Sequence, residues 1–233
     1  IECDYEHPGF LRVATSEKYR TRLLHEFEVA QSLGLDGIEW FDREQTQREV
    51  ASPLYLGAWW EPRCGLLNPA KLSWGWRDVV AAEGVQIFER TPVTELARQG
   101  SRLRLTTPRG SVLADSVVLA TNAYSHLIPQ LKRKQVPAWT HIVLTEPIDP
   151  VRMAELGWQR RQGIEDARNL VHYYRLTADN RLLMGGRDVS LSTGLDMDRD
   201  LNPVTFEALR QDVRTTFPAL AGIRFTHEWG GPV

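Results

Sequence analysis

Residues 114–129 read ADSVVLATNAYSHLIP and contain an apolar, largely β-branched run that stops at polar residues. The run at 117–120 predicts a strand buried on both faces, and Thr121 with Asn122 predicts a turn directly after it. Ligands of open α/β sheets gather at the carboxyl ends of such strands. We therefore expect the edge of a sheet at Thr121 and Asn122, with a bound molecule above it.

The segments around this stretch predict helices and mostly antiparallel strands. Amphipathic spacing predicts helices at 15–33, 42–50, 70–84 and 203–217, and the second of them opens with a capping box of Asp42 and Gln45. Alternating or apolar runs predict strands at 85–90, 102–107, 111–121, 140–148, 170–177, 181–188 and 223–233. This order of elements is typical of an α+β fold with a mixed, mainly antiparallel sheet.

The pattern also divides the chain into three segments. Residues 66–121 read as helix, strand and a meander, whereas the segments on either side hold helices and antiparallel strands. We predict that 1–65 and 127–233 join in one domain and that 66–126 belongs to another.

Composition excludes several classes of protein. The formal net charge of 233 residues is −2, so no field favours nucleic acid or an anionic membrane. No apolar run reaches the length of a membrane span, and the start has no signal-peptide pattern. The first residue is Ile, from which we expect a fragment or a processed product. Cys3 and Cys64 form no metal or redox motif, and we expect a reduced, cytoplasmic setting.

Familiar catalytic motifs are absent from the sequence. The six histidines lack metal-ligand spacing, so we expect no metal site. There is no nucleophile elbow, no P-loop and no G-x-G-x-x-G. His141 and His172 are the candidates for a proton acceptor near neutral pH, although a structural role is the preferred interpretation of both.

The strand around Tyr173, Tyr174 and Arg175 is the clearest candidate for a binding surface. Neighbours on a strand face opposite ways, so Tyr173 and Arg175 share one face and Tyr174 takes the other. An arginine fork binds a carboxylate at two points. The alternative is a core tyrosine beside a solvated arginine, and this arrangement is the commoner one, because tyrosines are often buried and arginines are mostly exposed. Gly185 and Gly186 permit a close approach of ligand or backbone, or mark a bulge.

Five stretches, at 65–96, 110–131, 143–148, 173–188 and 227–232, stand in the order and spacing of FAD-dependent amine oxidoreductases. The chain resembles the D-amino-acid-oxidase-like group, which includes sarcosine, glycine and gamma-glutamylputrescine oxidases. The resemblance implies a substrate domain joined to part of a Rossmann-like FAD-binding domain. It implies that Val93 and the turn at Ala120, Thr121 and Asn122 contact the dinucleotide, so adenosine and pyrophosphate would lie over the turn that opens this section.

The resemblance further implies oxidation of a C–N bond in an amine or amino acid, with hydride transfer to the flavin and hydrolysis of the imine. Tyr173, Tyr174, Arg175 and His141 are predicted to line the substrate pocket. The chain lacks the glycine-rich fingerprint that the family carries, so we expect FAD in the complete parent but not in this chain alone. The rival hypothesis is a non-catalytic module that binds a small ligand or a partner. The sequence gives no oligomeric state.

Overall fold

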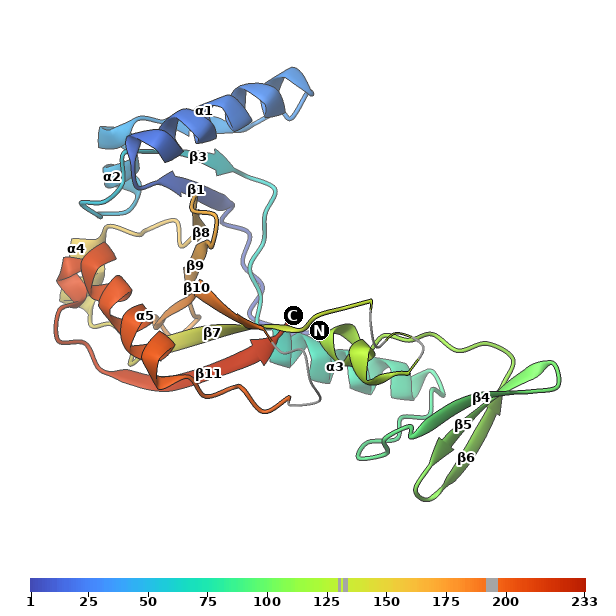
Figure 1. The fold of residues 1–233 in the computed structure, drawn as a ribbon. Coiled ribbons are helices and arrows are strands. Elements are labelled where there is room, and N and C mark those ends of the chain that lie inside the picture. Colours follow the sequence, from blue (N-terminus) through green and yellow to red (C-terminus); the bar gives the residue numbers. More distant parts are fainter. Residues whose placement is uncertain (130, 132–133, 192–196) are drawn as a thin grey trace. The chain divides into compact units, whose positions relative to one another are not determined.

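The computed structural model describes residues 1–129, 131, 134–191 and 197–233 and divides into two compact units (Figure 1). The smaller unit holds Ile1–Cys3 and Pro69–Gln135, and the sheet unit holds Asp4–Asn68 and Val136–Val233. The sheet unit is thus built from two segments of the sequence, one before and one after residues 69–135. The segment boundaries drawn from the sequence, at 65 and 126, lie near these divisions, and the roles assigned to the segments stay predictions.

The sheet unit is built on one mixed sheet of eight strands in the order β11-β7-β10-β9-β8-β1-β3-β2. The pair β1–β8 is parallel and every other pair is antiparallel. The predicted α+β class is therefore confirmed. The strands are β1 (Phe10–Ala14), β2 (Glu39–Phe41), β3 (Gly57–Glu61), β7 (Ala138–Thr145), β8 (Gly163–Asp166), β9 (His172–Leu176), β10 (Leu182–Leu191) and β11 (Phe225–Pro232).

The helices begin where side chains cap them. Ser16 accepts a hydrogen bond from the Tyr19 amide at the start of α1, and Asp42 with Gln45 forms the predicted capping box of α2. Asn202 caps α5, whose first position is held by a proline, which has no N–H that needs an acceptor. The helices are α1 (Glu17–Ser32), α2 (Arg43–Glu49), α3 (Pro69–Ala82), α4 (Pro150–Leu156) and α5 (Pro203–Thr216), with the 3₁₀ turns η1 (Asn122–Leu127) and η2 (Pro218–Leu220).

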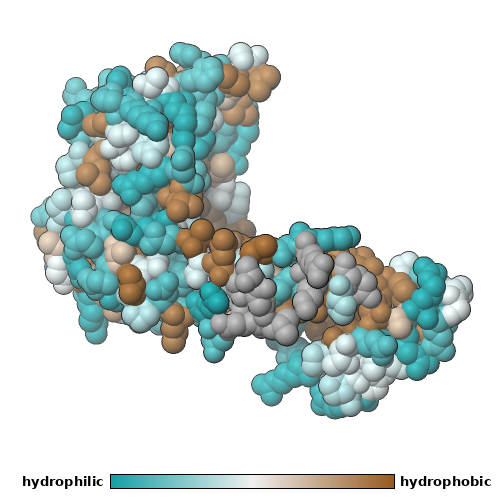
Figure 2. Space-filling model, viewed as in Figure 1, coloured by the Kyte–Doolittle hydropathy of each residue, from teal (hydrophilic) through white to brown (hydrophobic). Residues whose placement is uncertain are grey.

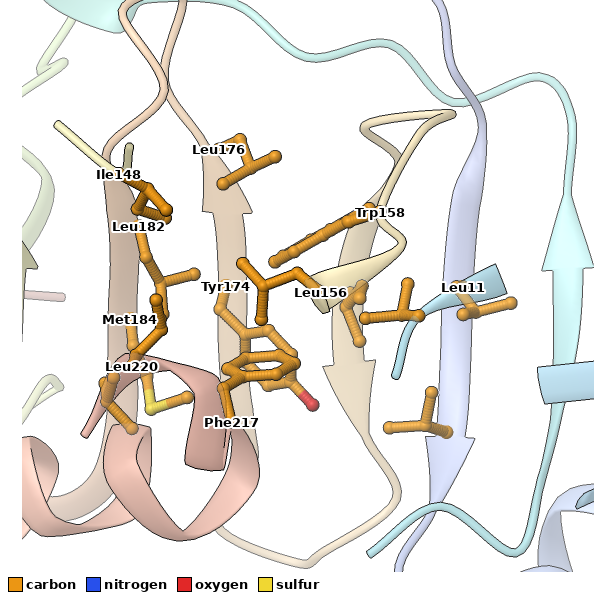
Figure 3. Close-up of a cluster of buried hydrophobic side chains, with 14 of the residues drawn as sticks. Leu11, Ile148, Leu156, Trp158, Tyr174, Leu176, Leu182, Met184, Phe217 and Leu220 are labelled. Carbon is orange, nitrogen blue, oxygen red and sulfur yellow. The ribbon is translucent and has the colours of Figure 1, made fainter. Parts of the chain in front are cut away.

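The main core lies between one face of the sheet and the layer of α4, α5 and η2. Tyr174 points toward Phe217 and Met184 toward Leu220, while Leu182 lies beside Ile148 (Figure 3). Alternation along each strand places these residues on one face. A second, smaller core lies on the opposite face, where α1 packs over β1, β2 and β3.

The smaller unit contains α3, η1 and a three-stranded antiparallel sheet of β4 (Glu95–Gln99), β5 (Arg102–Thr107) and β6 (Gly110–Ala114). The predicted meander is present. The predicted strand at 85–90 is wrong, and the strand predicted at 111–121 ends at Ala114. A strand needs a hydrogen-bonded neighbour, and no strand in the described part of the chain pairs with 85–90 or 117–120.

The apolar residues of these two stretches are consequently exposed. Phe88 is 65% and Val118 is 88% accessible to solvent, so 117–120 is not the buried strand that its composition predicts. Hydrophobic atoms are visible on the surface of the smaller unit in Figure 2. Both runs have the composition of strands, but a strand also requires a pairing partner in the sheet.

Candidate functional site

One row of paired residues crosses all eight strands on the face opposite α5. The side chains of this row point away from the main core. Tyr174, which follows Tyr173, and Met184, which precedes Gly185, point into that core, and neighbours on a strand face opposite ways. From β11 to β2 the row reads Trp229, Ile142, Gly185, Tyr173, Glu165, Arg12, Trp59 and Trp40.

Helix α1 covers one end of this row. The Phe27 ring packs 5.9 Å from both Trp40 and Trp59, measured between ring centroids. Arg12 reaches Glu26 of α1 at 2.7 Å and Glu165 of the sheet at 3.3 Å, so it joins helix and sheet electrostatically. The rest of the row, from Glu165 to Trp229, we call the open face.

The open face combines aromatic, apolar and charged groups. Trp229 is 37% exposed, and Tyr173 and Ile142 are half-buried. Tyr173 lies over Gly185, because a Cβ built on that glycine would come within 2.6 Å of the tyrosine ring. Aromatic rings beside a carboxylate form a surface that suits an apolar molecule carrying a positive charge.

Arg175 stands beside this row, as its alternation with Tyr173 predicts. It is paired in register with Leu183 and is half-buried. Its Nη1 donates to the Leu67 carbonyl at 2.6 Å, and its Nε donates to the Leu176 carbonyl at 3.2 Å. Burial lowers the pKa of Arg175, an effect that the Glu6 carboxylate opposes. These bonds engage two of its five N–H groups, so the guanidinium tethers the loop at Leu67 and retains donors for an anion.

The structure does not bring the four predicted pocket residues together. Tyr174 and His141 lie on the face covered by α5, away from Tyr173 and Arg175. The Tyr174 hydroxyl lies 2.7 Å from that of Tyr55, and burial raises the pKa of both phenols. His141 is 1% exposed and packs edge-on against Phe206. The substrate roles of all four stay predictions.

His172 lies at the start of β9 between two carboxylates. Its Nδ1 is 2.9 Å from Asp166 and its Nε2 is 3.0 Å from Asp212. Arg168 pairs with Asp166, and Arg187 pairs with Asp212, so His172, two carboxylates and two guanidinium groups form one connected series of contacts. Burial alone would lower the pKa of His172, but the hydrogen bonds to the two carboxylates outweigh it and raise the pKa. We call these residues the His172 chain.

The predicted cofactor residues lie in the smaller unit. Val93, Ala120, Thr121 and Asn122 are all exposed. The Thr121 hydroxyl bonds to that of Ser125 at 2.7 Å, and Asn122 has a positive φ of 41°. Their exposure leaves these residues accessible to a ligand, and their contact with the dinucleotide stays a prediction. A glycine-rich cradle for a pyrophosphate is absent from the sequence.

Sequence reasoning missed most of the open face. Trp229, Ile142 and Glu165 come from three strands far apart in the chain, and only strand register places them in line. The signal available beforehand was the two-residue alternation that put Tyr173 and Arg175 on one face.

Metal-binding clusters and membrane-spanning helices are absent from the part of the chain that the structure describes. Among residues 1–129, 131, 134–191 and 197–233, no group of three or more His, Cys, Asp or Glu side chains is placed to hold a metal ion. Within the same ranges, no helix combines the length and the apolar character that crossing a bilayer requires.

Comparison with known proteins gives a family match over the whole chain. Residues 1–233 match the family described as "DAO: FAD dependent oxidoreductase". The gamma-glutamylputrescine oxidoreductase of Escherichia coli (strain K12) is 32% identical over 233 residues, which are 99% of this chain and 52% of that protein. The chain spans about half the length of the curated relatives that it matches first.

Solved structures show the same fold. Glycine oxidase from Geobacillus kaustophilus matches with a TM-score of 0.83 at 20% identity, covering 100% of this chain and 60% of that one. L-Proline dehydrogenase from P. horikoshii matches with a TM-score of 0.81 at 17% identity, covering 99% of this chain and 61% of that one.

Proposed function

Because the chain belongs to the DAO family of FAD-dependent oxidoreductases, we propose that it supplies the substrate-facing sheet of an enzyme that oxidises the C–N bond of an amine or amino acid. The family confirms the resemblance identified from the sequence. The observation that carries the proposal is the open face, where Tyr173, Trp229 and Glu165 stand in one row with Arg175 beside them.

Each of these side chains has a role suited to its chemistry. FAD, when bound, supplies the acceptor for the hydride that leaves the carbon next to nitrogen. Tyr173 and Trp229 flank the substrate and exclude water from one side. Arg175 holds a substrate carboxylate through its remaining N–H groups, and Glu165 orients the amine by its charge. The imine that results is hydrolysed by water.

The smaller unit has the complementary role in this proposal. Segment 66–126 belongs to the FAD-binding layer, with Val93 and the turn at Ala120, Thr121 and Asn122 beside the adenosine. Segments 1–65 and 127–233 form the substrate domain. The exposed apolar stretches at 85–90 and 117–120 support this assignment, since exposed apolar surface of this extent marks a contact that the described chain does not satisfy.

The function is tested on the full-length protein that contains this chain. We expect it to purify with FAD and to be reduced anaerobically by at least one member of a panel of primary amines, secondary amines and amino acids, with a carbonyl compound as the product. A flavin-loaded protein that no amine reduces would contradict the proposal. Binding of an amine without flavin reduction would favour the rival, non-catalytic module.

The 233-residue chain alone is expected to purify without flavin and to bind no FAD at micromolar concentration. It lacks the glycine-rich turn that places a pyrophosphate on a helix N-terminus. The measurement is the visible absorbance spectrum of the purified chain, followed by titration with FAD. A stoichiometric flavin band would contradict this expectation, and the full-length protein is the positive control.

Arg175→Ala in the full-length enzyme is expected to lower kcat/KM for a carboxylate-bearing amine about ten- to a hundredfold, since a charge-assisted hydrogen bond contributes roughly 1.5–3 kcal/mol. Arg175→Lys keeps the charge and loses the two-point contact. Arg181→Ala is the control, because this arginine lies on the same hairpin but bonds to Asp179 in the turn. If Arg175→Ala lowers only the Tm, the guanidinium is purely the tether of the Leu67 loop.

A further inference from the structure

We propose that Gly185 fixes the pose of the Tyr173 ring and thereby sets how bulky a substrate the open face accepts. The first half concerns this chain alone. The second half rests on the proposed function, because it takes the open face to be the substrate surface.

The contact between the two residues is close and specific. A Cβ built on Gly185 would lie 2.6 Å from Cε2 and Cζ of Tyr173 and 2.7 Å from its hydroxyl oxygen. The ring of β9 therefore lies across the backbone of β10 at a distance that only a glycine allows. Any other residue would force the ring off this position, because real Cβ atoms do not approach to such distances.

The backbone of Gly185 gives no other reason for glycine. Its φ is not among the positive values of this chain, so an L-residue can adopt its extended conformation without strain. The obstacle is the far end of a flexible side chain, which can move at little cost. The residue at 185 therefore controls the position of the ring rather than the stability of the sheet.

The position of the ring decides the clearance above the sheet. Trp229 stands two strands from Gly185, across Ile142, at roughly 10 Å for two strand spacings. With its ring across Gly185, Tyr173 covers β10 at this point and leaves the surface above β7 open. A side chain at 185 lifts the ring or pushes it toward Ile142, and either movement narrows this space. Bulky substrates are then lost before small ones.

The first test measures the ring in the chain itself. Nitration of tyrosines by tetranitromethane, followed by mass spectrometry of the peptides, reports access to each phenol. Gly185→Ala is expected to raise the nitration rate of Tyr173 at least threefold, with a Tm within about 2 °C of the parent. Tyr5, 62% exposed, and the buried Tyr55 are internal standards that should not change.

Gly231→Ala is the matched control. Gly231 lies on β11 of the same sheet and on the same face as Trp229, and its Cβ would meet no described atom within 4 Å. It should leave Tyr173 nitration unchanged. An unchanged Tyr173 rate in folded Gly185→Ala, or an equal rise in Gly231→Ala, would overturn the proposal. Should Gly185→Ala fail to fold, Gly185 has a structural role and the proposal is equally refuted.

The second test uses the flavin-loaded full-length enzyme with two amines that differ only in bulk beside the nitrogen. Gly185→Ala is expected to lower kcat/KM for the bulkier amine at least tenfold more than for the smaller, with unchanged FAD content. An equal loss for both amines would refute the role in selectivity. If the parent enzyme oxidises no amine, the proposed function fails, while the nitration result still decides the pose of the ring.

Discussion

Replacing His172 with alanine is expected to lower the free energy of unfolding by about 1–3 kcal/mol, the usual cost of taking a hydrogen-bond partner away from a buried polar group. The side chains of His172 and Asp166 are each 4% exposed. Both imidazole nitrogens lie at hydrogen-bond distance from carboxylates, and an imidazole donates from both only when it is protonated. The variant therefore leaves the Asp166 charge buried with Arg168 as its remaining ion-pair partner.

The His172 chain also makes stability depend on pH. The folded pKa of His172 is raised above its ordinary value of 6.5. A group with a raised folded pKa contributes stability that is fully present below the unfolded pKa and is lost as pH rises through the folded pKa. We therefore expect the protein to lose stability above about pH 6.5, over the window that ends at the raised pKa.

At low pH the pKa shift of Asp212 has the opposite direction from that of His172, and stability is lost as the pH falls. Burial would raise the pKa of Asp212, but hydrogen bonds from His172 and Arg187 outweigh this effect and lower it. The stability that Asp212 contributes is present above its unfolded pKa, near 3.9, and is lost as pH falls through the lower folded value. The contacts among His172, its two carboxylate partners and their arginines are accordingly most stabilising between about pH 4 and pH 6.5.

The measurement is urea denaturation at intervals between pH 4 and pH 9, for the parent and His172→Ala. The difference in unfolding free energy should be largest near pH 5–6 and should shrink as pH rises. His227→Ala is the control, because this histidine is exposed on β11 of the same sheet. A difference that does not vary with pH would show that His172 is held as a neutral ring.

Local signals predicted those features that depend on neighbours in sequence. The capping box at Asp42 and Gln45, the hairpin of β9 and β10, and the opposite orientation of Tyr173 and Tyr174 are all present. Each is decided within a few residues by hydrogen-bond geometry or by the two-residue period of a strand.

The features that could not be predicted from the sequence depend on pairing between distant parts of the chain. The runs at 85–90 and 117–120 have the composition of strands but no partner in the described chain. The sequence offers His141 and His172 as candidates for a proton acceptor. In the structure Phe206 of α5 packs against His141, and Asp212 of α5 contacts His172. The row from Trp229 to Trp40 is set by the register of eight strands, which no single stretch encodes.

Gly185 and Gly186 are neighbours in sequence, but glycine is required for a different reason at each position. Gly186→Ala is expected to destabilise the sheet unit severely, whereas Gly185→Ala moves a side chain. Gly186 has a φ of +104°, a region that residues with a Cβ rarely adopt. Its Cβ would lie 1.9 Å from the Val171 carbonyl oxygen, which is backbone and has no rotamer to change.

The consequences of that collision extend to the His172 chain. The Val171 carbonyl accepts a hydrogen bond from the Arg187 amide at 3.1 Å, directly across Gly186, and Arg187 itself has a φ of 71°. The register of β10 against β7 shifts just beyond this point, between Gly186 and Ser190. The glycine thus permits the bulge that turns Arg187 toward Asp212, which it reaches at 2.6 Å.

We therefore expect Gly186→Ala to cost about 2–6 kcal/mol, the sum of roughly 1–3 for a strained backbone and 1–3 for overpacking. A loss near the upper value would unfold a domain of ordinary stability. Denaturant melts of Gly186→Ala and Gly185→Ala, made side by side, check the difference, with His172→Ala in the Gly186→Ala background as a further variant. If the bulge positions Arg187 for the His172 chain, the two losses will be less than additive, because each substitution breaks the same contacts. Strict additivity, or equal costs at 185 and 186, would show that the bulge and the ion pairs are independent.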